Sequence, residues 1–116
     1  MHRENQKRAM GIIDNFEKML ADGRDNPLLR FSLGNEYLKS DNAVKAAGHL
    51  RAAVAQDAGY SAAWKLLGKA LAQINDIDGA KSAYASGIAA ANAKGDKQAA
   101  REMSVFLKRL ERNAQG

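Results

Sequence analysis

The chain has 116 residues, of which 46% are hydrophobic and 27% are charged, with one proline and no cysteine. This composition is typical of one folded domain, and it excludes a disordered chain, a disulfide framework and a thiolate metal site. The net charge of +5 allows nucleic acid, an anionic membrane surface or an acidic peptide as partner and does not choose among them.

We expect neither a signal peptide nor a membrane span. No stretch approaches the roughly 20 apolar residues that a membrane span needs. The segment 1–9 is mostly polar, and the apolar patch at 10–13 is too short for a signal peptide. We therefore expect a cytoplasmic protein that does not associate with membranes.

Apolar residues recur at three- and four-residue steps along the chain, which predicts an all-α fold. The first helix ends at Asp22-Gly23, because glycine accepts the left-handed conformation of a helix stop. Asn26-Pro27 begins the second helix, and Ser61 is expected to cap the fourth. Short loops imply antiparallel neighbours in one compact domain, 1–116. The expected helices are 3–21, 27–39, 43–56, 62–74, 77–91 and 97–112.

A repeat of 34 residues relates the second and third helices to the fourth and fifth. Only four positions are identical between 27–60 and 61–94, but they include the mid-helix pair Gly34 and Gly68. A glycine costs roughly 1 kcal/mol in a helix, so a repeated one indicates a close helix crossing. Ala46 and Ala80, also 34 apart, are the expected small residues facing it. The other identical pairs are Leu33 with Leu67 and Ala55 with Ala89.

This pattern resembles the tetratricopeptide repeat, W-x2-L-G-x2-Y followed by A-x3-F and a late proline. The second repeat contains Trp64, Leu67, Gly68, Leu71, Ala80 and Tyr84 at these spacings; the first contains Arg30, Leu33, Gly34, Tyr37, Ala46 and Leu50. Arg30 and Leu71 depart from the pattern, and Ala58 and Asn92 stand where it has proline. The resemblance implies an α-solenoid with repeats 27–60 and 61–94, an N-terminal cap at 3–21 and a C-terminal cap at 97–112.

The caps are expected to cover the apolar ends of the repeat array. Phe16 lies 34 residues before Leu50, so the N-terminal helix can take the place of the second helix of a repeat. The last helix can take the place of the first helix of a repeat, with Ala99, Met103 and Phe106 inward. The cluster Val105-Phe106-Leu107 is either a tighter cap or the contact of a weak homodimer.

The resemblance also implies a function. The first helix of each repeat, here 27–39 and 62–74, lines a concave groove that binds a peptide or protein. Lys65 and Lys69 share a helix face, so they could hold a carboxylate by charge-assisted hydrogen bonds. The resemblance to the carboxylate clamp of chaperone-binding members is incomplete, because Phe31 stands where that clamp has lysine. Solvated lysines with no ligand are the other interpretation. The expected groove residues are Phe31, Asn35, Leu38, Lys39, Lys65, Lys69 and Gln73, with Leu28, Ala62 and Ala72 beside them.

We expect no catalytic site, cofactor or metal. His49 has no histidine or cysteine companion at helical spacing, and the glycines form no phosphate-binding motif. Basic residues on the last helix make nucleic acid the alternative partner, but no aromatic series for base stacking accompanies them. They are Lys97, Arg101, Lys108, Arg109 and Arg112.

Overall fold

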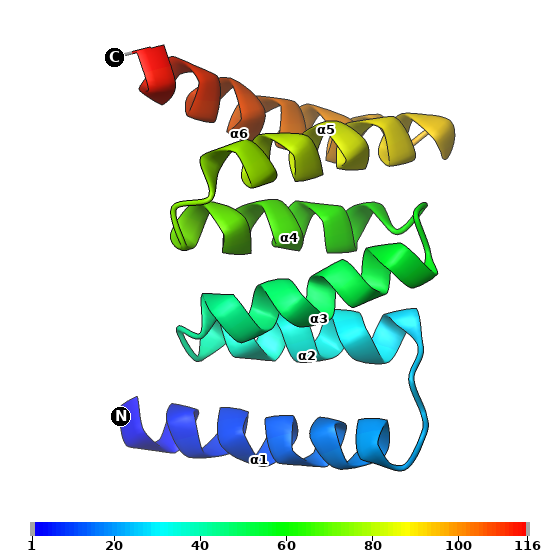
Figure 1. The fold of residues 1–116 in the computed structure, drawn as a ribbon, viewed down its shortest axis with the longest axis vertical. Coiled ribbons are helices and arrows are strands. Elements are labelled where there is room, and N and C mark those ends of the chain that lie inside the picture. Colours follow the sequence, from blue (N-terminus) through cyan, green and yellow to red (C-terminus); the bar gives the residue numbers. More distant parts are fainter. Residues whose placement is uncertain (1, 116) are drawn as a thin grey trace.

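A computed structural model describes the backbone of residues 2–115 and the side chains of residues 11–113. Within this part the protein contains six helices and no strand, which confirms the predicted all-α fold (Figure 1). The fifth and sixth helices extend beyond their expected ends. The helices are α1 (His2–Ala21), α2 (Pro27–Lys39), α3 (Ala43–Gln56), α4 (Ser61–Gln73), α5 (Ile77–Ala93) and α6 (Lys97–Gln115).

The helices stack in chain order as antiparallel neighbours, with the two termini at opposite ends of the stack (Figure 1). Each helix packs on the next, and the backbone of α4 also approaches those of α2 and α6, whereas no Cα atoms of α3 and α5 lie within 8 Å of each other among the described residues. The row α2, α4 and α6 is therefore drawn closer together than the row α3 and α5. The stack curves toward the first row, which we call the inner face.

Side-chain caps fix most of the helix starts. The side chains of Asn26, Asn42, Asp76 and Asp96 each accept a hydrogen bond from a backbone N–H three residues later. The predicted cap at Ser61 is wrong. The carbonyl of the preceding residue already accepts a bond from the backbone N–H of Trp64, so Ser61 lies inside the first turn of α4.

The predicted repeat residues form the core. Most are nearly inaccessible to solvent, and only Arg30 and Trp64 are half-buried. The indole N–H of Trp64 donates to the carbonyl of Ala58 in the loop between α3 and α4 (2.8 Å), and its Cβ lies against Gly87 of α5. The buried repeat residues are Leu33, Gly34, Tyr37, Ala46, Leu50, Leu67, Gly68, Leu71, Ala80 and Tyr84.

The two mid-helix glycines make close crossings, and the side chains nearest to them are larger than the alanines expected there. The atoms nearest to a Cβ built on Gly34 belong to Leu50, and those nearest to one on Gly68 belong to Tyr84. Ala46 and Ala80, the residues expected at these crossings, are fully buried on the same helices as Leu50 and Tyr84. Each glycine makes room for the larger side chain one turn further along the second helix.

The last helix covers the end of the stack. Met103 is completely buried, and Phe106, Leu107 and Leu110 pack half-buried on the same cluster. Val105 points outward and is 48% exposed. Of the cluster predicted as a cap or a dimer contact, the second and third residues therefore belong to the cap. No described helix combines the length and apolarity required to cross a bilayer.

Candidate functional site

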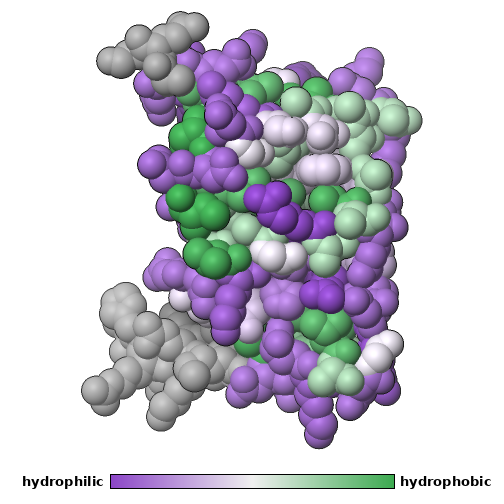
Figure 2. All heavy atoms as spheres, in the orientation of Figure 1, coloured by the Kyte–Doolittle hydropathy of each residue, from purple (hydrophilic) through white to green (hydrophobic). Residues whose placement is uncertain are grey.

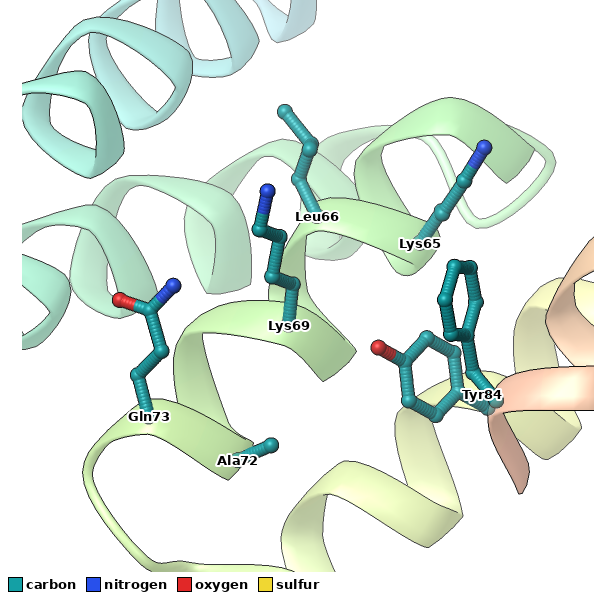
Figure 3. Close-up of a pocket in the computed structure, with 7 residues that line it drawn as sticks. Lys65, Leu66, Lys69, Ala72, Gln73 and Tyr84 are labelled. Atoms are coloured by element: carbon teal, nitrogen blue, oxygen red, sulfur yellow. The ribbon is translucent and has the colours of Figure 1, made fainter. Parts of the chain in front are cut away.

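A pocket of about 630 Å³ opens between α4, α5 and α6 on the inner face (Figure 3). Three of the predicted groove residues line it, Lys65, Lys69 and Gln73, and all three come from α4. Because they lie four residues apart, they follow one another along one side of this helix. The remaining lining residues are Leu66, Ala72, Tyr84 and Phe106.

An aromatic pair forms the apolar part of the pocket. The rings of Tyr84 and Phe106 stack with centroids 5.6 Å apart and an interplanar angle of 24°. Burial raises the pKa of the Tyr84 phenol, so the hydroxyl stays protonated at neutral pH and can donate a hydrogen bond. Figure 3 shows this hydroxyl pointing toward the helix that carries Lys65 and Lys69.

The two lysines differ in their partners. The ammonium of Lys65 forms an ion pair with Glu102 of α6 and lies 6.0 Å from the centre of the Phe106 ring. The Lys65 ammonium holds the pKa of the Glu102 carboxyl below its usual range. Lys69 is exposed and makes no ion pair with any described side chain. Of the two, Lys69 is therefore the cation available to a ligand.

The predicted groove residues of α2 lie outside this pocket. The ring of Phe31 stacks on that of Tyr60 (5.1 Å between centroids), and Lys39 lies 3.4 Å from Glu36. Asn35 and Leu38 are half-buried, and Leu28 is 65% exposed. The seven predicted residues thus divide into an α4 group in one pocket and an α2 group that continues the inner face.

Sequence reasoning did not assign Tyr84, Phe106 and Glu102 to the site. Tyr84 was expected only in the core and Phe106 only in the cap. One signal was present: Gln98, Glu102 and Phe106 repeat at four-residue spacing, as Lys65, Lys69 and Gln73 do on α4. This spacing places each row on one face of its own helix, and both helices occupy equivalent positions in the repeat.

A second polar cluster joins α1, α2 and α3 at the other end of the stack. The guanidinium of Arg30 binds both carboxylate oxygens of Asp25 (2.8 and 2.9 Å), and Gln56 donates to the same carboxylate (2.9 Å). Another nitrogen of Arg30 lies 3.1 Å from Nδ1 of His49. The Nε2 atom of His49 lies 3.1 Å from Glu17 of α1.

These contacts determine which nitrogen of the His49 ring carries the proton. Arginine can only donate, so Nδ1 accepts and the ring proton sits on Nε2, which faces Glu17. Burial lowers the pKa of His49, against the opposing effect of the Glu17 carboxylate. Arg30 and Gln56 hold the pKa of the Asp25 carboxyl well below its usual range. The described residues contain no group of three potential metal ligands. In this cluster His49 connects Arg30 of α2 with Glu17 of α1.

No family model matches the chain. A curated protein of Pseudomonas aeruginosa, named as a TPR (tetratricopeptide) repeat-containing protein, is 54% identical over 101 residues, which cover 87% of this chain and 96% of the relative. The chain belongs to the TPR family.

Solved structures agree with this assignment. A Bordetella parapertussis protein with a solution structure is 49% identical to this TPR chain, with a TM-score of 0.75, and the match covers 88% and 89% of the two chains. The first TPR of Spaghetti (RPAP3), solved with the HSP90 peptide SRMEEVD, has the same fold at 18% identity, a TM-score of 0.80 and coverage of 96% and 83%.

Proposed function

We propose that this TPR chain is an interaction module that binds an acidic peptide or protein segment along its inner face. The observation that carries the proposal is the pocket between α4, α5 and α6, where two lysines stand beside an apolar aromatic pair. TPR domains are generally protein-interaction modules, and the Spaghetti domain was solved with a peptide that contains acidic residues.

The pocket has the size and chemistry for part of a peptide. A volume of about 630 Å³ lies within the usual range for ligand sites, roughly 300 to 1,000 Å³. An apolar ligand side chain would pack on Tyr84 and Phe106, and a carboxylate next to it would accept hydrogen bonds from Lys69 and from the Tyr84 hydroxyl. Burial of the apolar side chain supplies affinity, and the charged contacts supply selectivity for acidic segments.

The α2 part of the inner face would bind the rest of the segment. Phe31 and Leu38 offer apolar surface, and Asn35 offers both a donor and an acceptor for a ligand backbone. Lys39 adds a further positive charge. A ligand that spans α6, α4 and α2 would therefore cross three parallel first helices.

A random dodecapeptide library displayed on phage, selected against the immobilised protein, tests this proposal. We expect enrichment of acidic and apolar residues, and amide shifts of α4 in NMR spectra when a selected peptide is added. Lys69→Glu should abolish the enrichment. Lys108→Glu makes the same charge change at an exposed position of α6 away from the pocket and should preserve it.

The alternative function is nucleic-acid binding by the terminal helices, which rests on the exposed basic residues of α6. It predicts binding to duplex or single-stranded DNA that weakens steeply with salt and survives Lys69→Glu. That result, together with no peptide mapped to the inner face, would contradict the proposal.

A further inference from the structure

Two rows of side chains, one on α4 and one on α6, meet at the pocket. On α4 the row is Lys65, Lys69 and Gln73. On α6 the row is Gln98, Glu102 and Phe106, and Figure 1 shows that α4 and α6 run in the same direction. Lys65 pairs with Glu102, whose other carboxylate oxygen lies 3.4 Å from Gln98 Nε2. One of the two lysines at the pocket therefore already forms an ion pair with a carboxylate of the chain itself.

We propose that Glu102 occupies, in the ligand-free chain, the place of a ligand carboxylate, and that an acidic segment binds by displacing it from Lys65. This inference rests on the proposed function and adds to it the residue that controls selectivity. Binding then becomes an exchange of carboxylates on Lys65, while Lys69 makes the first contact.

The exposure of the ion pair permits such an exchange. The side chains of Lys65 and Glu102 are 36% and 42% exposed, so water and a ligand can reach both groups. An ion pair of this exposure contributes little to stability, and the flexible glutamate can rotate into solvent without disturbing the buried Met103 one position further along. Gln98, one turn before Glu102 on α6, remains as a partner for the displaced carboxylate.

The spacing of the two lysines also specifies the ligand. Side chains four residues apart on a helix have Cβ atoms about 5–6 Å apart. In an extended peptide, alternate side chains point the same way at about 6.6–6.8 Å spacing. An extended segment with acidic residues at alternate positions would place one carboxylate at each lysine. The residue between them points to the opposite side, so the apolar residue that packs on Tyr84 and Phe106 must lie two positions before or after the acidic pair, on the same side of the chain.

Fluorescence anisotropy with the labelled hexapeptide Ser-Glu-Ser-Glu-Ser-Leu tests the exchange, because its two glutamates and its leucine lie on one side of an extended chain. The hexapeptide Ser-Gln-Ser-Gln-Ser-Leu is the control that lacks the glutamate charges. We expect Glu102→Gln to bind the glutamate peptide about two- to fivefold more tightly than the unmodified chain, which corresponds to removal of a half-exposed ion pair. Glu111→Gln makes the same charge change at an exposed position of α6 and should bind like the unmodified chain.

Three outcomes separate the inference from the proposed function. If Glu102→Gln and the unmodified chain bind the glutamate peptide equally, or if Glu111→Gln gains as much as Glu102→Gln, the inference is wrong and the proposed function stands. If no variant binds either peptide, both the inference and the proposed function are wrong. If only Glu102→Gln binds detectably, the exchange is supported.

A second measurement reports the exchange directly. The pKa of the Glu102 carboxyl, followed by carbon NMR, lies below its usual range because of Lys65. Saturation with the glutamate peptide should raise this pKa, because Lys65 then pairs with the ligand. An unchanged Glu102 pKa in the saturated complex would overturn the inference even if the peptide binds.

Discussion

The ring of Tyr84 fills the space that a side chain on Gly68 would need. A Cβ built on Gly68 would lie 2.6 Å from Cε1 of Tyr84 and 2.7 Å from Cζ, closer than real contacts allow. Tyr84 is itself 4% exposed and stacked on Phe106, so it has little room to move. This one crossing therefore connects the repeat core with the aromatic pair of the candidate site.

Gly68→Ala should consequently lower the free energy of unfolding by about 1–3 kcal/mol, because an overpacked crossing outweighs the gain in helix propensity. Gly48→Ala is the matched control. Gly48 is exposed within α3, nothing lies within 4 Å of its Cβ position, and we expect a gain of about 0.5–1 kcal/mol. Urea unfolding of both variants decides this, and equal effects would contradict the close crossing.

Met103→Ala should cost about 2–5 kcal/mol, because this side chain is fully buried beneath the C-terminal cap and its removal leaves a cavity. Val105→Ala, two residues away and 48% exposed, should change stability by less than about 0.5 kcal/mol. Thermal unfolding followed by circular dichroism measures both. A small loss for Met103→Ala would mean that α6 does not hold the end of the stack as described.

Arg30→Gln should loosen the N-terminal cap alone. Arg30 joins Asp25 in the loop after α1 to His49 on α3, and each helix of the stack depends mainly on its neighbours. Hydrogen exchange measured by mass spectrometry should accelerate in peptides that cover residues 11–26 and stay unchanged in α5 and α6. Arg51→Gln, which removes an exposed pair with Asp76 at 3.8 Å, should leave both regions unchanged. Faster exchange throughout the chain would contradict the local role.

His49 should make stability depend on pH between about 5.5 and 7.5. Its pKa is lowered in the folded chain, so the unfolded state binds more protons in this range and stability falls as pH falls through the ordinary histidine value of about 6.5. The slope for one group stays below about 1.4 kcal/mol per pH unit. His49→Gln keeps an acceptor for Arg30 and a donor for Glu17, and should show a smaller slope in urea unfolding. The contribution of the second histidine, His2, cancels in the comparison; identical slopes would contradict the prediction.

The hairpin architecture was accessible from the sequence because its signals are local. The glycine stops and the Asn26-Pro27 start each depend on a few neighbouring residues. The 34-residue spacing of Gly34 and Gly68 can be counted directly in the sequence. The identity of the side chain that faces each glycine was not accessible, because it depends on where two helices cross. Ala46 and Leu50 lie one turn apart, and sequence spacing alone does not decide which of them reaches the crossing.

The candidate site was accessible only in part for the same reason. Lys65, Lys69 and Gln73 follow from the register of α4 within its repeat. The last helix deviates from that register, so the contact of Glu102 with Lys65 and the position of Phe106 required the packed structure. The cluster of Arg30, His49 and Glu17 lies where the first repeat departs from the family pattern, and no repeat rule describes such a departure.

Trp64 gives the chain an optical reporter at its centre. It is the sole tryptophan; its indole N–H donates to the Ala58 carbonyl, and its Cβ lies against Gly87. Its emission therefore follows the middle of the array, while ellipticity averages over all six helices. If the ends fray before the centre, the emission midpoint in urea will exceed the ellipticity midpoint, and the gap measures how far the array departs from all-or-none unfolding.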